Sequence, residues 1–268
     1  MDGVVLRREL VAAIRAELDG SLNACLATVV VGDNPRCHIL ARGRRSAAED
    51  AGLRAVGVDL PSAATQDEVE EALARLADDH GVHGIFVQLP LPAHLDPDRI
   101  LRLVAPAKDV DGMGPDSVHA PPTAQAVVRL LDHYAVAVTG RRVVIVGRVA
   151  GMATLLARRG ADVTEADEAD EADEAAPDVC READILIAAG GRPGSIGPDH
   201  VRPGAAVVDV TGDVDLERVE AIAGAVAPYP AGVGPVALAC LLRNTLDAAK
   251  LRAVTSPPGT GPTGIDGL

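Results

Sequence analysis

The feature that most constrains the fold is an alternation of apolar runs with amphipathic stretches. Short runs rich in Val, Leu, Ile and Ala predict buried strands at Ala24–Val31, Gly84–Leu89, Arg142–Val146, Ala183–Ala188 and Ala205–Val210. Between them, apolar residues at helical spacing predict helices at Arg42–Gly52, Gln66–His80 and Thr123–His133. Strands that alternate with helices form parallel sheets joined by right-handed crossovers, so the sequence predicts an α/β protein.

The chain has 268 residues, which is enough for two α/β domains, each with its own core. A Pro- and Gly-rich stretch at Ala105–Thr123 indicates the crossing from one domain into the next. We therefore expect a first domain at residues 1–119 and a second at 120–234. A final helix at 235–254 follows a Gly-Pro break and is expected to pack back on the first domain. The Gly-, Pro- and Thr-rich tail at 255–268 is expected to be disordered.

Charge and composition exclude several classes of protein. The formal net charge of −14 argues against a nucleic-acid binder, which needs clustered Lys and Arg. No apolar run reaches the ~20 residues that cross a bilayer, and no signal peptide opens the chain, so we expect a soluble cytoplasmic protein without a membrane partner. The four cysteines have neither metal-ligand spacing nor a disulfide pattern, so no metal is expected. The acidic repeat Glu165–Glu174 predicts a solvated helix or loop.

Four short blocks occur in a fixed order along the chain. They are Val31–Pro35, Gly84–Pro92, Lys108–Gly112 and Pro230–Pro235, the last followed by Leu241–Thr245. In order and spacing they resemble the signatures of the bifunctional methylenetetrahydrofolate dehydrogenase/cyclohydrolase family, over about Leu6 to Lys250. The resemblance implies an N-terminal folate domain, a Rossmann-like dinucleotide domain and a cleft between them. It also implies a homodimer paired through the second domains.

The same blocks are suited to hold a pterin ring. Gln88 ends a strand just before a rigid turn that begins at Pro90, which would place an amide at the lip of a cleft. Asp111 can accept two hydrogen bonds from an aminopyrimidine edge, and the resemblance implies that the matching aspartate grips the pterin. The folate-binding candidates are completed by Gly232, Val233, Gly234 and Pro235. Alternatively these are turn residues of a hinge, and Asp109 is expected to be a solvated turn acid.

One helix face departs from the family pattern. The resemblance implies a tyrosine that stacks on the folate and, four residues later, a lysine that is the acid/base of the cyclohydrolase step. Here these positions are Leu40 and Arg44. Arginine keeps the charge but, with a pKa above ~12, cannot shuttle a proton near neutrality. Asp111, Arg44, Cys37 and His38 are the candidate catalytic residues, although His38 is more typical of a surface or packing histidine.

The dinucleotide side departs from the pattern as well. The family has Gly-Arg-Ser-x-x-Val-Gly-x-Pro after a strand, whereas this chain has Val149 for the serine and lacks the proline. With about three residues lost, the loop has fewer N–H groups for a pyrophosphate, and Gly147, Arg148 and Gly151 form a degenerate cofactor site. The acidic run from Glu165 repels a 2′-phosphate, although one acid there could favour an NAD ribose. We therefore expect NADP not to be bound.

These departures lead to one hypothesis and three alternatives. The hypothesis is a repurposed enzyme that binds tetrahydrofolate as 5,10-methylenetetrahydrofolate and transfers its methylene, through an iminium ion in a Mannich-type reaction, to a small-molecule nucleophile. The alternatives are an ordinary methylenetetrahydrofolate dehydrogenase/cyclohydrolase, a non-catalytic folate-binding pseudoenzyme, and a scaffold with no folate site. The match of Gln88 and Asp111 argues against the scaffold. The sequence does not separate the transfer enzyme from the pseudoenzyme.

Overall fold

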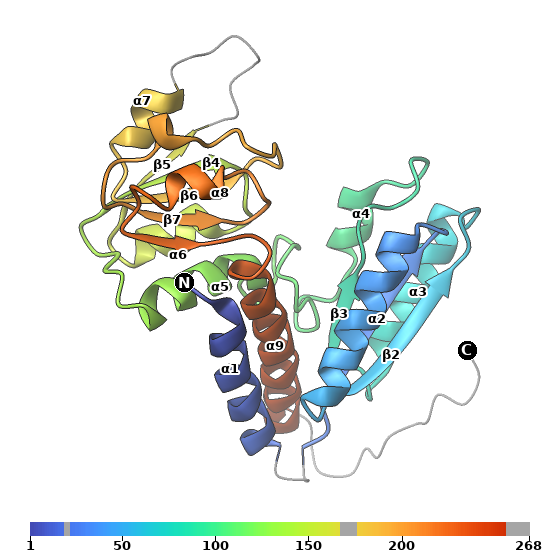
Figure 1. Ribbon diagram of the computed structural model, residues 1–268. Helices are drawn as coiled ribbons and strands as arrows, with labels where there is room; N and C mark the ends of the chain where they lie inside the picture. The colour runs from blue at the N-terminus through green and yellow to red at the C-terminus, as the bar shows by residue number, and fades with distance from the viewer. Residues whose placement is uncertain (19–21, 167–175, 256–268) are drawn as a thin grey trace. The chain divides into compact units, whose positions relative to one another are not determined.

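The computed structural model describes residues 1–18, 22–166 and 176–255, and its chain divides into two compact units. The three-stranded unit consists of Val11–Pro122 and Leu241–Leu268, and the five-stranded unit consists of Met1–Leu10 and Thr123–Cys240. The division passes through two long helices, α1 (Gly3–Glu17) and α9 (Val233–Thr255), so each unit contains part of both (Figure 1). No described helix is long and apolar enough to cross a membrane.

The three-stranded unit is built on a parallel sheet in the order β2-β1-β3. Its strands are β1 (Cys25–Val31), β2 (Arg54–Leu60) and β3 (Gly84–Val87), and its helices are α2 (Pro35–Asp50), α3 (Gln66–Asp78) and α4 (Pro97–Arg102). Leu73 of α3 and Ile100 of α4 pack on one face of the sheet with Val29 and Ile85. On the other face, Cys37 and Ala41 of α2 pack on Val30. The central strand is therefore buried on both faces, as a parallel sheet requires.

The five-stranded unit is a doubly wound parallel sheet in the order β5-β4-β6-β7-β8, with helices on both faces (Figure 1). Its strands are β4 (Arg142–Gly147), β5 (Asp162–Ala166), β6 (Ile185–Ala189), β7 (Ala206–Asp209) and β8 (Ala225–Ala227). Helices α5 (Pro122–His133) and α6 (Met152–Arg158) pack on one face, and α7 (Ala176–Arg181) and α8 (Leu216–Val219) on the other. A short 3-10 helix lies at Pro198–His200. The strand order reverses between β4 and β6, which in such folds is where ligands bind.

The structure confirms the predicted fold class, a two-part α/β protein with a C-terminal helix that packs on the three-stranded unit. In α9, Asn244 Nδ2 donates to the carbonyl of Val110 at 2.8 Å. All five predicted strands are present with ends shifted by one or two residues. The sequence missed β2, β5 and β8. These three strands lie at sheet edges and are partly exposed, so they lack the continuous apolar run of a central strand.

Two predicted helix starts were wrong, that of α2 by more than one turn and that of α9 by two residues. Helix α2 begins at Pro35 rather than Arg42, because Asn34 caps it through a hydrogen bond from Arg36 N to its side chain. Helix α9 begins at Val233 rather than at Pro235. A proline is tolerated in the first turn because its missing N–H would have no helical partner there. Most of the acidic repeat lies outside the described residues, as does the tail beyond Thr255.

Candidate functional site

Helix α2 carries three of the candidate residues on one face. β1 ends at Val31, and Gly32, with φ of +93°, turns the chain toward the capped start of the helix. Cys37, Leu40 and Arg44 then follow at spacings of three and four residues, which places them on the same side of a helix. Cys37 is buried, whereas Leu40 is 40% exposed. The face therefore passes from the sheet outward, with Arg44 one turn beyond Leu40.

The structure brings Arg44 and Gln88 together. Arg44 Nη1 donates to Gln88 Oε1 at 2.6 Å, and Gln88 Nε2 donates to the Leu89 carbonyl at 2.6 Å. The guanidinium carbon also lies 4.2 Å from the ring centroid of Phe86, in a cation–π contact. Burial lowers the pKa of Arg44, while the nearby Asp111 acts in the opposite direction. Arg44 is thus fixed as a cation over a ring, and sequence reasoning missed Phe86 because an apolar residue in a strand gives no such signal.

The loop from Lys108 to Gly114 is organised by buried polar groups. Lys108 Nζ donates to three carbonyls at the end of α3, those of Leu76, Ala77 and Asp79, at 2.8, 2.6 and 2.7 Å. Asp109 is 3% exposed, and its carboxylate accepts from Gly112 N at 3.0 Å and Gly114 N at 2.7 Å. The expectation that Asp109 is a solvated turn acid was therefore wrong. A turn acid is buried when it supplies acceptors for N–H groups that would otherwise have no partner.

Gly112 has a conformation that the loop requires. Its φ is +67°, and a Cβ atom there would lie 2.7 Å from the backbone nitrogen of Pro121. Only glycine combines this backbone with so close an approach. Asp109, Gly112 and Lys108 therefore fix the backbone on both sides of Asp111, which sets the direction of its side chain.

Asp111 differs from its neighbours because its carboxylate has no hydrogen-bond partner among the described residues. It is half-buried, and its pKa is raised to about 6, first by removal from water, then by the charge of Asp109, with Arg44 acting to lower it. A carboxylate in this environment gains from a ligand that donates hydrogen bonds. The arrangement therefore offers an acceptor, Asp111, near a donor, Arg44, whose guanidinium uses one of its N–H groups on Gln88.

Cys37, Pro90 and His38 do not share hydrogen bonds with Asp111 among the described residues. Cys37 Sγ lies 3.6 Å from the Leu89 carbonyl, so it contacts the turn that begins at Gln88. Pro90 in that turn is exposed. A ring nitrogen of His38 lies 2.9 Å from the Gly32 carbonyl, and its Nδ1 lies 3.9 Å from Asp59. Within the described part of the chain, no hydrogen bond or ion pair joins His38 to Arg44, Gln88 or Asp111.

The Gly232–Pro235 block belongs to the five-stranded unit. Gly232 N donates to the Pro228 carbonyl at 2.7 Å, and Val233 is 3% exposed. A Cβ atom on Gly3 would lie 1.8 Å from the Gly232 carbonyl oxygen, so this turn packs directly on the start of α1. Val233, Gly234 and Pro235 form the first turn of α9, and a Cβ atom on Gly234 would meet nothing within 4 Å.

The degenerate dinucleotide loop lies at the carboxyl ends of β4 and β6. Gly147, with φ of +86°, ends β4, and a Cβ atom there would lie 2.5 Å from the Ala189 carbonyl oxygen at the end of β6. Gly151, with φ of +68°, precedes α6, and Arg148 lies between them. The Val149 side chain packs against the core, where the family pattern has a serine. The loop thus has glycines at the two positions of positive φ, while the Val149 side chain packs on the core and offers no hydrogen bond to a phosphate.

Two buried aspartates that sequence reasoning missed lie next to this loop. Asp213, 1% exposed, accepts from Gly190 N at 2.8 Å, from Arg192 N and from Thr211 Oγ1. Asp209, 4% exposed, accepts from Gly212 N, Asp213 N and Val214 N. They hold the loops that follow β6 and β7. The available signal was the spacing of Asp209 and Asp213 around Gly212, directly after an apolar strand.

Two profiles of one family match most of the chain. The catalytic-domain profile of tetrahydrofolate dehydrogenase/cyclohydrolase matches residues 1–111, and its NAD(P)-binding-domain profile matches residues 121–253. The bifunctional protein FolD of Methanoculleus marisnigri is 40% identical over 94% of this chain and 96% of its own length. FolD of Acidiphilium cryptum is 41% identical over 93% and 98%.

Solved structures give the same result. The bifunctional FolD methylenetetrahydrofolate dehydrogenase/cyclohydrolase of Campylobacter jejuni is 33% identical, with a TM-score of 0.88 over 94% of this chain and 98% of its own. The Trypanosoma brucei dehydrogenase-cyclohydrolase, solved with NADP and an inhibitor, is 31% identical, with a TM-score of 0.88 over 96% and 98%. Both domains and nearly the whole length are covered. The chain belongs to the tetrahydrofolate dehydrogenase/cyclohydrolase family.

Proposed function

We propose that the three-stranded unit binds the pterin of a reduced folate, with Asp111 as the acceptor for its aminopyrimidine edge. The observation that carries the proposal is the half-buried Asp111 carboxylate, whose pKa is raised to about 6 and which has no hydrogen-bond partner among the described residues. A pterin brings adjacent N–H donors, which relieve that desolvation. Arg44, held by Gln88 and Phe86, supplies donors to the ligand, and the exposed Leu40 packs on a flat ring.

The reaction best supported is oxidation of methylenetetrahydrofolate by a nicotinamide dinucleotide. Full-length relatives are named bifunctional FolD, and one solved relative holds NADP, which favours the ordinary activity over the repurposed methylene transfer. The five-stranded unit fits such a cofactor in its fold, because glycines stand at the carboxyl ends of β4 and β6 where the strand order reverses. The backbones of Gly147–Gly151 and Gly190–Gly194 would hold the dinucleotide, which supplies a hydride acceptor.

The two activities of the family make different demands on Arg44. Oxidation moves a hydride from the folate carbon and asks no side chain to give or take a proton. Hydrolysis of the methenyl bridge needs water activated and a ring nitrogen protonated, which the resemblance assigns to a lysine at this position. Arg44 does not deprotonate near neutrality, and it is tied to Gln88 and Phe86. We therefore propose a dehydrogenase in which the cyclohydrolase step is strongly impaired.

A second candidate function is the transfer of the methylene group to another small molecule. It is favoured by the combination of Arg44 for lysine with Val149 for the phosphate-binding serine, which weakens both ordinary half-reactions. The bond from the methylene carbon to N10 would break as N10 gains a proton, which leaves an iminium ion on N5. A carbon or nitrogen nucleophile would add its electron pair to the iminium carbon and lose a proton. Loss of a second proton from the nucleophile, with cleavage of the carbon–N5 bond and protonation of N5, would then release tetrahydrofolate and leave the methylene group on the nucleophile. Positioning of the two reactants would supply much of the rate.

The test is a set of assays on one purified protein. Oxidation is followed spectroscopically with methylenetetrahydrofolate and either NAD or NADP, and hydrolysis with methenyltetrahydrofolate alone. We expect saturable oxidation without hydrolysis above background. Folate binding in calorimetry, with no oxidation by either nucleotide, would overturn the dehydrogenase and leave the transfer reaction. That reaction is then tested by following a labelled methylene into candidate nucleophiles against an enzyme-free control.

Substitution at Arg44 separates the two half-reactions. Arg44→Lys restores a side chain that can exchange a proton. We expect hydrolysis to rise by about 10²-fold, the lower end of general acid–base effects. Arg45→Lys is the matched control, because Arg45 is the next residue of α2 and its Nη1 bonds Thr28 instead of Gln88. Equal hydrolysis in the two variants would contradict the role given to Arg44.

A homodimer, proposed from the resemblance, is checked by light scattering.

A further inference from the structure

A cavity lies in the five-stranded unit at the edge opposite to the dinucleotide loops. It has a volume of about 490 Å³ and is lined by residues at the starts of neighbouring strands, among them Ile185 of β6, Ala206 of β7 and Ala225 of β8. The glycines proposed to hold a dinucleotide stand at the ends of β4 and β6 instead. The strands are parallel, so the two sites lie at opposite edges of one sheet. The size is within the range of small-molecule sites.

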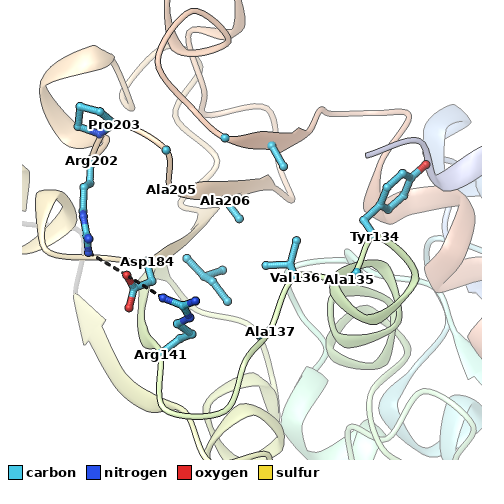
Figure 2. Close-up of a pocket in the computed structure, with 14 residues that line it drawn as sticks. Tyr134, Ala135, Val136, Ala137, Arg141, Asp184, Arg202, Pro203, Ala205 and Ala206 are labelled. Atoms are coloured by element: carbon cyan, nitrogen blue, oxygen red, sulfur yellow. Dashed lines mark hydrogen bonds and ion pairs between the residues drawn. The ribbon is translucent and has the colours of Figure 1, made fainter.

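One end of this cavity carries an excess of positive charge. Arg202 Nη1 donates to Asp184 Oδ1 at 2.8 Å, and Arg141 Nη1 lies 3.8 Å from the same oxygen (Figure 2). The hydrogen bond from Arg142 N, followed by the charges of Arg202 and Arg141, lowers the pKa of Asp184, which stays ionised. Two guanidinium groups against one carboxylate leave a net positive charge, in a chain whose formal net charge is −14.

Most donors of the two arginines have no partner among the described residues. Both side chains are 53% exposed, and the 3.8 Å separation leaves Arg141 without a hydrogen bond to Asp184. Among the described residues, no other partner is found for the Arg141 guanidinium. Two guanidinium groups held near each other by one acid match the oxygens of a carboxylate or phosphate, which they can bind with paired hydrogen bonds.

The other end of the cavity is aromatic, and the floor between the ends is apolar. Figure 2 shows Tyr134 apart from the arginines, with Val136 and Ala206 between them. The Tyr134 hydroxyl accepts from Asp2 N at 2.7 Å and donates to the Asp2 carbonyl at 3.0 Å, which fixes the ring. In a chain with three aromatic residues, one Phe and two Tyr, a fixed ring beside a cavity is a suitable surface for a flat ligand.

We propose that this cavity binds an organic anion that has a flat apolar body and one carboxylate or phosphate group. The anionic group contacts Arg141 and Arg202, and the flat body lies on the apolar floor toward Tyr134. The site is separate from the folate and dinucleotide sites, so it serves a second ligand.

The experiment is calorimetric titration of the full-length protein with phenyl phosphate and with benzoate. Inorganic phosphate serves as the probe without a body, and phenol as the probe without a charge. We expect saturable binding of at least one of the two anions, with a Kd about tenfold or more below that of inorganic phosphate or phenol. The phosphate and carboxylate arms decide which anion the arginines prefer. Failure of both to saturate would overturn the proposal.

Variants locate the binding within the cavity. The double variant Arg141→Gln/Arg202→Gln should lose binding, while Arg142→Gln should keep it, because Arg142 is adjacent in sequence but pairs with Glu182 and does not line the cavity. Tyr134→Leu should remove the advantage of phenyl phosphate over phosphate, and Tyr134→Phe should keep it. Circular dichroism checks that each variant is folded. Equal binding by wild type and the double arginine variant, or equal loss in Arg142→Gln, would contradict the site.

Discussion

Asp111 in the three-stranded unit and Asp213 in the five-stranded unit are both withdrawn from water, yet their surroundings differ. Asp213 accepts three hydrogen bonds, from Gly190 N, Arg192 N and Thr211 Oγ1. Asp111 accepts none from the described residues, and its pKa is raised to about 6. The first carboxylate is used completely by the fold. The second carboxylate keeps its hydrogen-bonding capacity free for a ligand.

The number of hydrogen bonds that a buried carboxylate accepts separates structural acids from binding acids in this protein. A buried carboxylate with all its bonds made stabilises the loops around it, and its removal leaves N–H groups without partners. A carboxylate that is desolvated without bonds costs stability, and such a cost persists where a site is built for a ligand. The two aspartates should therefore respond to substitution in opposite ways.

The largest expected effect is on stability at Asp213. Asp213→Ala should lower the free energy of unfolding by about 3 kcal/mol, because several buried donors lose their partner at once. Asp162→Ala is the matched control, since Asp162 is an exposed acid on β5, and it should change stability by less than about 0.5 kcal/mol. Urea unfolding followed by circular dichroism measures both. A loss of unfolding free energy no larger in Asp213→Ala than in Asp162→Ala would contradict the structural role of Asp213.

The next effect is on folate affinity at Asp111. Asp111→Ala should weaken binding of tetrahydrofolate by about 2–3 kcal/mol, the scale of a lost charge-assisted hydrogen-bond pair. Stability should stay the same or rise, because the substitution removes a desolvated charge that has no hydrogen bond in the fold. Calorimetry and urea unfolding on the same preparation give the two quantities. Unchanged affinity would show that Asp111 does not face the ligand.

A smaller effect is expected from pH. The pKa of Asp111 in the folded protein, about 6, is above its ordinary value of 3.8, so between these pH values the folded state binds the proton more tightly. The stabilisation that Asp111 contributes is thus fully present below pH 3.8 and is lost as the pH rises through about 6. Folate binding needs the ionised carboxylate, so it should weaken as the pH falls through about 6. Asp111→Asn should abolish the pH dependence of stability and that of folate binding. Urea unfolding and calorimetry at several pH values, on wild type and variant, measure the two differences.

The smallest effect is expected at Cys37. Its thiol makes only long contacts with the Leu89 and Pro90 carbonyls, at 3.6 and 3.9 Å. Cys37→Ser, which replaces the thiol by a hydroxyl of similar size, should change the free energy of unfolding by less than about 1 kcal/mol and leave turnover unaltered. Thermal unfolding and the oxidation assay check this. A large loss of turnover would instead support the catalytic role that the sequence suggested for Cys37.

The sequence predicted the central strands, because strands buried on both faces read as continuous apolar runs, as in Cys25–Val31 and Arg142–Gly147. The motifs also made Gln88, Arg44 and Asp111 candidate site residues, and this stays a prediction. Edge strands such as Arg54–Leu60 escaped, since one side of them meets solvent and the run of apolar residues is broken. The start of α2 escaped as well, because its cap and proline precede a polar first turn.

Residue order and local hydrophobicity were enough to predict the fold class and the family. Only the tertiary structure decided which charges are used by the fold. In the sequence, Asp109 and Asp213 look no different from Asp111. Backbone N–H groups of its own loop bond Asp109, an N–H group of the loop after β6 bonds Asp213, and none among the described residues bonds Asp111. The path of the folded backbone decides which N–H groups point at each carboxylate, and the order of residues around the three aspartates does not show it.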